Sequence, residues 1–332
     1  MDGREWIRQL SNGYDLLLDN ASVNTVLSSP NSKLKSLFDT FKKECISKLS
    51  EISGIKARLT LKPNVTPVFV RARPVLFKLA ALVEQELDNL ESAGIIEKVT
   101  TSRWATPIVP ILKRDGSIRI CGDYKVTVNP HLIVDDRPFP TVDELFAKLA
   151  RGTKFSKIDL EQAYLQLEIA PEDREILTLS TCKGLYKVNR LMYGIAPGPA
   201  IWQREIENIL QGIEGVAIFI DDIIITGESD EIHVVRLEKV LHRLHSHNIQ
   251  LNWEKSTFFL DKVSYCGYTL DKVGVHKEKD KMEAIKNMSR PKNVSEVRTF
   301  TGMINYYGRF IPHLSTILHP LNRLLSKNSL FQ

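Results

Sequence analysis

Two adjacent aspartates divide an apolar stretch of this sequence into two short runs. The segment Ala217–Thr226 reads A-I-F-I-D-D-I-I-I-T, with Asp221 and Asp222 at its centre. Each run has the length and the β-branched and aromatic residues of a strand, so the two-residue polar break between them predicts a tight hairpin. Two ionised carboxylates at its tip repel each other, and burial also disfavours their charged form. A divalent cation offsets both effects, and Mg²⁺ prefers such oxygen ligands; an ordinary Asp-rich turn is the alternative.

A third aspartate ends another predicted strand. The block Phe155–Tyr164 reads F-S-K-I-D-L-E-Q-A-Y and places Asp159 after an apolar run. If this strand lies beside the hairpin, three carboxylates converge. Three such groups can hold two Mg²⁺ ions about 3.5–4 Å apart, as in metal-assisted phosphoryl transfer. We expect one ion to lower the pKa of a primer 3′-hydroxyl and the other to hold a triphosphate and its leaving pyrophosphate.

The composition is that of a globular protein with two or three packed subdomains. The chain has 332 residues, of which 43% are hydrophobic and 26% are charged, enough to bury sizeable cores. No apolar run approaches the ~20 residues that span a bilayer, and Met1–Leu10 lacks the apolar core of a signal peptide. The four cysteines are isolated in the sequence, which indicates reduced thiols in an intracellular protein.

Positive charge gathers in the C-terminal part of the sequence. Residues 272–332 contain eleven lysines and arginines but four acidic residues, whereas the whole chain carries a net charge of +5. The other residues are therefore slightly acidic as a group. A basic region beside a near-neutral body predicts contact with a polyanion, and a solvated basic face is the alternative.

Hydrophobic periodicity and turn residues predict an α+β fold with antiparallel strands. A helix is expected over Arg73–Ala93, stopped by Gly94. Strands are expected over Ala105–Leu112 and Ser117–Cys121, joined by the turn Lys113–Gly116, whose Asp-Gly step favours a hairpin. The other predicted elements are helices at Leu34–Leu49, Thr141–Leu149, Pro199–Gln211, Asp230–His247, Pro291–Phe310 and Leu314–Leu325, and strand structure within Leu251–Leu270.

Three further residues have side chains suited to binding a nucleotide. Lys113 and Arg119 flank the Asp-Gly hairpin, where they could close over a triphosphate, because ammonium and guanidinium groups both bind phosphate oxygens. Ordinary surface charge is the alternative for this pair. Tyr164 follows Asp159 by five residues, so its ring could pack under a sugar and exclude a 2′-hydroxyl; a core tyrosine is the alternative.

Some histidines and aromatic residues give weaker signals. Three histidines lie within residues 242–247 at the end of a predicted helix, where a solvated face favoured by the helix dipole outweighs a metal site. We expect Trp104 to be buried rather than to stack on a template base. We also expect Tyr306 and Tyr307 to pack inside their own helical region.

Seven blocks in a fixed order make the chain resemble one protein family. The sequence from Leu61 to Leu325 resembles the reverse transcriptase of a Gypsy-type LTR retrotransposon. The blocks are Gly94–Tyr124, Phe155–Tyr164, Leu191–Gln203, Phe219–Asp222, Leu251–Lys255, Tyr265–Tyr268 and Arg298–Pro312. A lone pair of aspartates would support the resemblance weakly, whereas seven ordered blocks support it strongly.

The resemblance implies a right-hand polymerase fold of fingers, palm and thumb. The palm is expected to hold an antiparallel sheet with packed helices, the catalytic hairpin and the primer grip. The expected divisions are a linker or upstream remnant at 1–60, fingers at 61–134 and 167–196, palm at 135–166 and 197–271, and a basic helical thumb or the start of a connection region at 272–332. No RNase H region is expected within these residues.

The resemblance also implies roles for individual residues and partners. Asp159, Asp221 and Asp222 are the expected catalytic residues and the ligands of two Mg²⁺ ions, which Mn²⁺ could replace. The expected dNTP-binding residues are Lys113, Arg119, Tyr164, Tyr193, Gly194 and Lys255, and the expected primer grip is Cys266 with Gly267. The implied partners are dNTPs and an RNA or DNA template with its primer, without a membrane. The implied locations are the cytoplasm, in a retroelement particle, and the nucleus.

The predicted function is RNA-directed and DNA-directed DNA polymerisation, in which a dNTP is joined to a primer 3′-hydroxyl. The family usually has Pro-Phe-Gly where this chain has Met192-Tyr193-Gly194, and it usually has other residues at Pro197 and Gly198. These departures keep open a domesticated or decayed copy that binds nucleic acid without catalysis. A non-catalytic subunit of a dimer is a third alternative, and the sequence does not set the oligomeric state.

Overall fold

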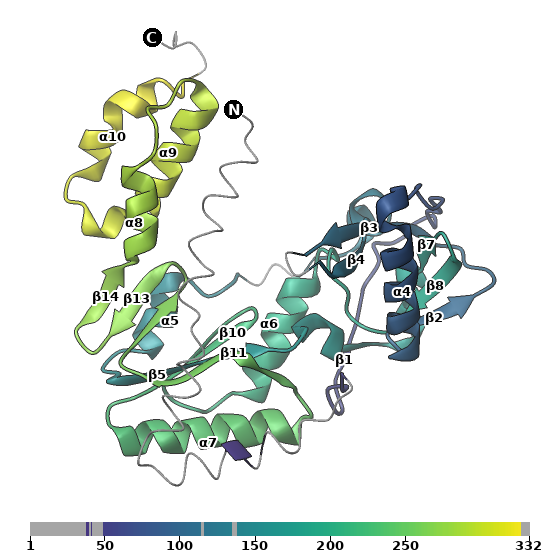
Figure 1. Ribbon diagram of the computed structural model, residues 1–332, viewed down its shortest axis with the longest axis horizontal. Coiled ribbons are helices and arrows are strands. Elements are labelled where there is room, and N and C mark those ends of the chain that lie inside the picture. The colour runs from purple at the N-terminus through teal and green to yellow at the C-terminus, as the bar shows by residue number, and fades with distance from the viewer. Residues whose placement is uncertain (1–37, 40, 42–48, 114–115, 135–137, 327–332) are drawn as a thin grey trace. The chain divides into compact units, whose positions relative to one another are not determined.

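The computed structural model (Figure 1) describes most of the chain, namely residues 38–39, 41, 49–113, 116–134 and 138–326. The chain divides into two compact units, one spanning residues 23–261 and the other including residues 262–332. Each unit contains helices and a mostly antiparallel sheet, so the predicted α+β class is confirmed. In the described part of the chain, no helix is both long enough and apolar enough to cross a membrane.

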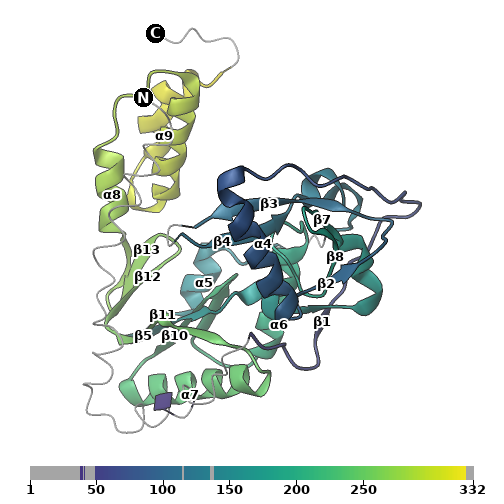
Figure 2. The ribbon, with the colours of Figure 1, turned by 45° about the vertical axis from the view of Figure 1, so that its right-hand side comes forward.

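A four-stranded antiparallel sheet forms the centre of the larger unit. Its strands, in spatial order, are β11 (Leu251–Leu260), β5 (Lys154–Leu160), β10 (Asp222–Gly227) and β9 (Val216–Phe219). Helix α7 (Asp230–Ser246) runs along one face and contacts β10 and β5 (Figure 2). Ile223, Ile224 and Ile225 of β10 are all fully buried. Because both faces of β10 are covered, its sequence is a continuous apolar run rather than an alternation.

Local sequence signals set the ends of the helices beside this sheet. Ser229 accepts a hydrogen bond from the backbone N–H of Ile232 at the start of α7, and acidic residues in the first turn complement the helix dipole. Thr141 and Glu144 form a capping box at the start of α5 (Val142–Lys148). A third helix, α6 (Gly198–Ile209), contacts β9. All three helices lie where the sequence predicts them, within one or two residues.

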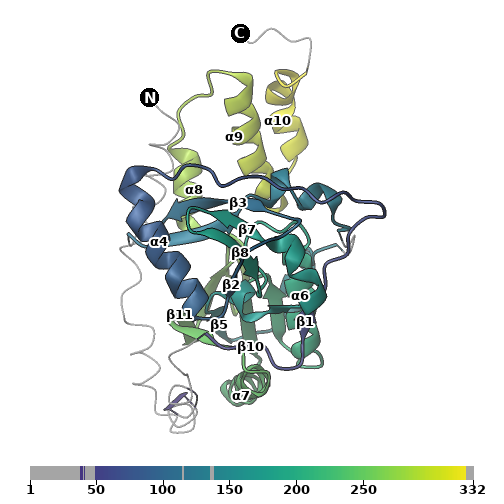
Figure 3. The ribbon, with the colours of Figure 1, turned by 90° about the vertical axis from the view of Figure 1, so that its right-hand side faces the viewer.

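A second sheet in the same unit has five strands. Their spatial order is β2 (Ile96–Val99), β8 (Gly184–Val188), β7 (Leu179–Thr181), β3 (Thr106–Leu112) and β4 (Ile118–Gly122). Helix α4 (Phe77–Ser92) lies beside this sheet and contacts β4 and β2 (Figure 3). It buries Val83, Leu87 and Leu90 at helical spacing. Gly94 follows the helix with φ +72°, which confirms the predicted glycine stop.

Part of the N-terminal segment belongs to the packed core. Strand β1 (Lys56–Ala57) pairs with β6 (Glu168–Ile169), and Phe38 is buried. Of the helix predicted over Leu34–Leu49, four positions are described: residues 38, 39 and 41 are helical, Leu49 is not, and the others lie outside the described residues. The core therefore begins before residue 61, where the fingers were expected to start.

The smaller unit joins a three-stranded meander to three helices. Its elements are β12 (Lys262–Tyr265), β13 (Tyr268–Asp271), β14 (Gly274–Lys277), α8 (Lys279–Lys286), α9 (Val294–Tyr306) and α10 (Leu314–Arg323). Asn293 accepts a hydrogen bond from the backbone N–H of Glu296, so α9 begins after this cap rather than at Pro291. The division at 261/262 precedes the expected palm–thumb boundary at 271/272, and the expected primer grip lies in this unit.

Single-turn helices connect several of these elements. They span Tyr124–Val126, Asn129–His131, Ala163–Gln166, Pro171–Asp173, Glu175–Leu177 and Gly308–Phe310.

Candidate active site

The β9–β10 hairpin carries the adjacent aspartates, but its turn lies one residue earlier than predicted. Asp222 belongs to β10, where it lies opposite Phe219 of β9 and Asp159 of β5. The turn residues are therefore Ile220 and Asp221, and the predicted pair Asp221 and Asp222 was wrong by one position. Ile220 has φ 56°, the positive value that a type II′ turn requires at its first central residue. The tight hairpin itself is confirmed.

Strand pairing brings the predicted carboxylates into one region. Asp159 and Asp222 are direct cross-strand neighbours, and Asp221 follows from the adjoining turn. Like charges placed opposite each other destabilise a sheet. The arrangement on its own is therefore unfavourable for folding, and a bound cation would offset the repulsion between the carboxylates.

Burial disfavours the ionised form of two of these carboxylates. Burial raises the pKa of Asp221, and the nearby charges of Asp159 and Asp222 raise it further. Burial likewise raises the pKa of Asp159, while the charge of Lys255 opposes this effect. Among the described residues, the Oδ1 atom of Asp221 is buried and has no hydrogen-bond partner. Such an orphaned oxygen is costly, and a divalent cation is the type of partner that it lacks.

A lysine occupies part of this region. The Nζ atom of Lys157 lies 2.9 Å from Oδ2 of Asp222 and forms an ion pair with it. Within the described residues, no three His, Cys, Asp or Glu side chains are arranged to hold a metal ion. At the three aspartates, the ammonium group contacts an oxygen that a metal would use. The three carboxylates and the unpartnered oxygen of Asp221 have the chemistry that Mg²⁺ requires. The side chains as observed, however, are arranged around an ion pair with Lys157.

Two side chains of α6 hold the turn that presents Asp221. The backbone N–H of Ile220 donates to Oε1 of Gln203 at 2.6 Å, and Nε1 of Trp202 donates to the carbonyl of Ile220 at 2.9 Å. The Nε2 atom of Gln203 also donates to the carbonyl of Ile218 at 2.9 Å. A β-branched residue with positive φ costs about 1–3 kcal/mol, which these bonds offset. The sequence signal for this role was an amide within the apolar face of α6, and it was missed.

Three of the predicted dNTP-binding residues gather near Asp221. The rings of Tyr164 and Tyr193 meet edge to face with centroids 5.2 Å apart. The guanidinium carbon of Arg119 lies 4.6 Å from the centroid of Tyr193, a cation–π contact. Burial raises the pKa of both tyrosines, and the charge of Asp221 adds to it in each case. Tyr164 is also buried against Trp202, so its ring serves the core as well as the site.

Gly194 is required by the backbone beside this group. It has φ +97°, and a Cβ atom there would lie 2.8 Å from the carbonyl oxygen of Gly122. Asn129 fixes the same loop, because its Nδ2 donates to the carbonyl of Gly194 and its Oδ1 accepts from the N–H of Ala196. The loop is therefore held closely against the end of β4.

The two predicted lysines lie on exposed backbone. Lys113 ends the described part of the β3–β4 hairpin, whose tip lies outside the described residues. Lys255 lies where the register of β11 shifts between Asn252 and Thr257, and such bulges redirect side chains. Its charge acts on Asp159, so this lysine is close to the carboxylates.

The expected primer grip is a tight turn in the smaller unit. Cys266 and Gly267 have φ 47° and 71°, as a type I′ turn requires. The hydroxyl of Tyr306 donates to the carbonyl of Cys266, and that of Tyr307 donates to the carbonyl of Gly267 at 2.8 Å. The hydroxyl of Tyr268 donates to the carbonyl of Tyr306 at 2.6 Å. Tyr307 is buried in its unit, as predicted, whereas Tyr306 is 45% exposed, and both tyrosines hold this turn.

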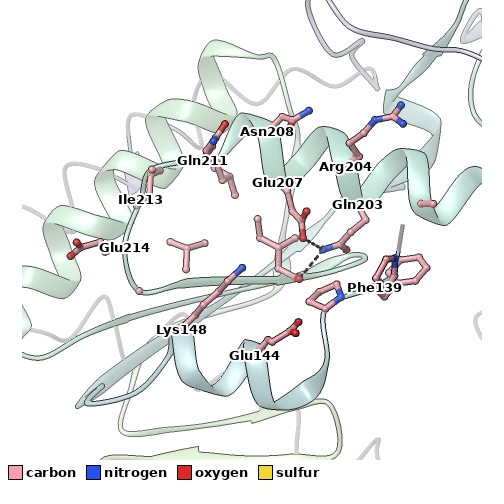
Figure 4. A pocket seen from close by; sticks show the side chains of 18 residues that line it. Phe139, Glu144, Lys148, Gln203, Arg204, Glu207, Asn208, Gln211, Ile213 and Glu214 are labelled. Carbon is pink, nitrogen blue, oxygen red and sulfur yellow. Dashed lines mark hydrogen bonds between the residues drawn. The ribbon is translucent and has the colours of Figure 1, made fainter. Parts of the chain in front are cut away.

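A cavity of about 720 Å³ lies away from the aspartates. It is bounded by α5, α6 and β9, and Figure 4 shows Glu144, Lys148 and Glu207 around it. The amide of Gln203 faces this cavity and bonds to Glu207 and to the carbonyl of Ile218. None of the three aspartates lines the cavity.

The weaker predictions have simple structural outcomes. Trp104 is buried, with 3% of its surface exposed, as predicted. His242 and His245 each lie edge to face with Phe41. They form no metal site with other described residues.

The sequence and the fold were compared with known proteins. Residues 111–270 match the family described as "Reverse transcriptase (RNA-dependent DNA polymerase)". These residues form a reverse transcriptase domain, and the relatives described next support a reverse transcriptase region of an LTR retrotransposon.

Several relatives extend this similarity beyond the matched residues. The chain is 35% identical over 77% of its length to an uncharacterized protein of Caenorhabditis elegans, of which it covers 20%. It is 27% identical over 96% of its length to the Tf2-3 transposon polyprotein of Schizosaccharomyces pombe, of which it covers 24%. It is 30% identical over 82% of its length to the retrovirus-related Pol polyprotein from transposon opus of Drosophila melanogaster, of which it covers 28%. The reverse transcriptase chain thus spans about a quarter of the length of these relatives.

Solved structures share the fold of this reverse transcriptase. A foamy viral protease-reverse transcriptase in complex with double-stranded DNA has a TM-score of 0.83 and 23% identity, and the match covers 94% of this chain and 56% of that chain. A second foamy viral structure, in complex with an RNA/DNA hybrid, has a TM-score of 0.80 and 23% identity, with coverages of 94% and 43%. The right-hand polymerase fold predicted from the sequence is therefore confirmed.

Proposed function

We propose that this chain catalyses RNA-directed and DNA-directed DNA synthesis by two-metal nucleotidyl transfer. The observation that supports this function most strongly is the pairing of Asp159 with Asp222 across β5 and β10, with Asp221 in the adjoining turn. The charges of Asp159 and Asp222 raise the pKa of Asp221, and one buried oxygen of Asp221 has no partner among the described residues. A fold would gain nothing from this arrangement without the cations that neutralise it.

In this proposal, Asp159, Asp221 and Asp222 hold two Mg²⁺ ions, and Mn²⁺ can replace them. When bound, the metals supply activation of the primer 3′-hydroxyl and charge neutralisation on the triphosphate. The chain itself positions these ligands through strand pairing and through the bonds of Trp202 and Gln203 to the turn.

The proposed dNTP site adds side chains around Asp221. Arg119 and Lys113 contact the triphosphate, and Arg119 leaves its contact with Tyr193 to do so. Tyr164, whose ring is held by Trp202, lies under the sugar and disfavours a 2′-hydroxyl. Gly194 lets the backbone approach closely beside Tyr193, and Lys255 neutralises the leaving pyrophosphate. These assignments rest on the gathering of Tyr164, Tyr193 and Arg119 near one carboxylate.

The proposed partner is a primed RNA or DNA template. The basic residues after position 272 suit contact with its phosphates, and Cys266 with Gly267 guides the primer. The seven ordered sequence blocks support a Gypsy-type affiliation.

Primer extension tests the proposed function. The full chain is supplied with poly-rA/oligo-dT or a primed DNA template, dNTPs and either Mg²⁺ or Mn²⁺. Extension that is lost in Asp221→Asn is the expected result. Binding of the primed template without extension under either metal would contradict catalysis and would favour a decayed or domesticated nucleic-acid-binding copy.

A further inference from the structure

One positive side chain is in direct contact with one of the three aspartates. Among the described residues, Lys157 forms an ion pair with one of them, through Nζ and Oδ2 of Asp222 at 2.9 Å. Arg119 and Lys255 act on the carboxylates through space, but neither has an ion pair with them in the described part of the chain. Lys157 is therefore the protein's own cation at this site.

The sheet itself fixes the position of this lysine. Lys157 lies two residues before Asp159 on β5, so both side chains leave the same face of the strand. Asp222 lies directly opposite Asp159, which makes Lys157 its diagonal neighbour. Strand register therefore keeps this lysine within reach of the same carboxylate.

The ion pair is partly shielded from water. The side chains of Lys157 and Asp222 are 27% and 33% exposed. At this depth an ion pair is stronger than on an open surface, although solvent still screens it. A metal ion that binds Oδ2 of Asp222 competes with this ammonium group, because both cations are attracted to the same carboxylate oxygen.

We propose that Lys157 is the resident counter-cation of the metal-free site, and that its ammonium group competes with a divalent ion for Oδ2 of Asp222. The proposal rests on the proposed function, in which Asp222 is a metal ligand. Lys157 is then a positioning residue that offsets the repulsion between Asp222 and its neighbouring carboxylates when no metal is bound. It also weakens metal binding to the free protein, so the metal binds more readily once the incoming triphosphate brings additional ligands.

Metal affinity separates this role from a purely structural one. Removing the positive charge eliminates both the competition for Asp222 and the repulsion of an incoming metal, so affinity rises. If the ion pair only supported the fold, its loss would leave metal affinity unchanged or lower it through disorder of the carboxylates. The two roles therefore predict opposite signs.

The test is a titration of the full chain with Mn²⁺, in the absence of nucleic acid and dNTP, followed by electron paramagnetic resonance of the free ion. Lys157→Met keeps the apolar stem and removes the charge. We expect its Kd for Mn²⁺ to fall roughly threefold to tenfold, the range expected for a partly screened ion pair. The unfolding temperature should also rise more on addition of Mn²⁺ than it does in the wild type.

Matched variants complete the experiment. Lys157→Arg keeps the charge and should bind Mn²⁺ as the wild type does. Lys157→Gln also removes the charge and should lower the Kd for Mn²⁺, so it replaces Lys157→Met if the methionine variant folds poorly. Lys154→Met removes another lysine of β5, which pairs with Asp261 at 2.6 Å, and should change nothing. Affinity that is unchanged or weaker in both uncharged variants would overturn the proposal.

The same titration separates this proposal from the function on which it rests. The Asp222→Asn substitution, made in a chain that keeps Lys157, should weaken Mn²⁺ binding relative to the wild type. If it does not, the proposed metal site fails. If it does, and the Lys157 variants still bind no more tightly, the counter-cation proposal fails alone.

Discussion

At the scale of single residues, one carboxylate of the site is left with an oxygen that no described residue satisfies. Buried polar atoms elsewhere in the larger unit can be paired within the fold, as the hydroxyl of Ser156 and Nε2 of His233 show by bonding to each other at 2.8 Å. Asp221 keeps a buried oxygen without a partner among the described residues. The fold therefore tolerates an unfavourable group where the proposed chemistry needs one.

His233 gives the fold a pH dependence of its own. Burial, together with the charges of Arg236 and Lys154, lowers the pKa of His233 to about 4, whereas an unfolded histidine titrates near ~6.5. Between these values the unfolded chain binds a proton that the folded chain does not, so stability falls as pH drops from about 6.5 towards 4. We expect this group to lower the free energy of unfolding by up to about 3 kcal/mol over that range.

Urea unfolding at pH 7 and at pH 4.5 measures this effect. His233→Gln removes the titrating group and should lose less stability than the wild type between the two pH values. Equal losses in the two proteins would show that His233 does not titrate as described.

At the scale of elements, the hairpin turn depends on a neighbouring helix. Gln203→Met keeps the length of the side chain but leaves the N–H of Ile220 and the carbonyl of Ile218 without partners. We expect a loss of about 1–3 kcal/mol in the free energy of unfolding. We also expect kcat for extension to fall about tenfold or more, because a misplaced ligand costs that much, while KM for dNTP changes little. Gln211→Met changes an exposed residue after α6 and is the matched control. It should retain the free energy of unfolding and the kcat of the wild type.

The loop beside β4 can be tested with a pair of glycines. Gly194→Ala and Gly212→Ala both place an alanine at positive φ, +97° and +82°, at a cost of about 1–2 kcal/mol each. At position 194 the new Cβ would also lie 2.8 Å from the carbonyl of Gly122, whereas at position 212 nothing lies within 4 Å. Thermal unfolding should therefore show a clearly larger loss for Gly194→Ala. Equal losses would mean that the close backbone approach is unimportant.

The sequence predicted these elements well where local signals decide them. The Asp-rich hairpin, the capping box of Thr141 and the stop at Gly94 all follow from short-range patterns. The turn was misplaced by one residue because only the pairing of Asp222 with Asp159 reveals that Asp222 is part of a strand. The ion pair of Lys157 and the hydrogen bonds of Trp202 and Gln203 join segments far apart in the chain. No local pattern encodes such contacts.

At the scale of the whole molecule, the net charge of residues 272–332 differs from that of the rest of the chain. The basic residues after position 272 are the proposed contact for nucleic-acid phosphates. We expect the affinity for primed template to fall steeply with salt, because each neutralised phosphate releases condensed counterions. The double variant Lys286→Ala/Lys292→Ala should reduce the slope of log affinity against log salt by about two. Fluorescence anisotropy at several salt concentrations measures this slope.

A lysine in the larger unit provides the control for that measurement. Lys239→Ala removes one charge from α7 and should leave the slope unchanged. An unchanged slope in the double variant would remove the basic segment from the proposed nucleic-acid interface.

The pairing of Asp159 with Asp222 across the sheet is the centre of the proposed function, and single-nucleotide incorporation by Asp159→Asn tests it most directly. The measurement uses preformed enzyme–primer–template with Mg²⁺, and circular dichroism verifies the fold. Asp261→Asn, which alters an exposed carboxylate paired with Lys154, is the control. We predict that Asp159→Asn binds the primed template but incorporates no nucleotide, while the control incorporates it at the wild-type rate. Incorporation by Asp159→Asn at the wild-type rate would contradict the assignment of these carboxylates as the catalytic centre.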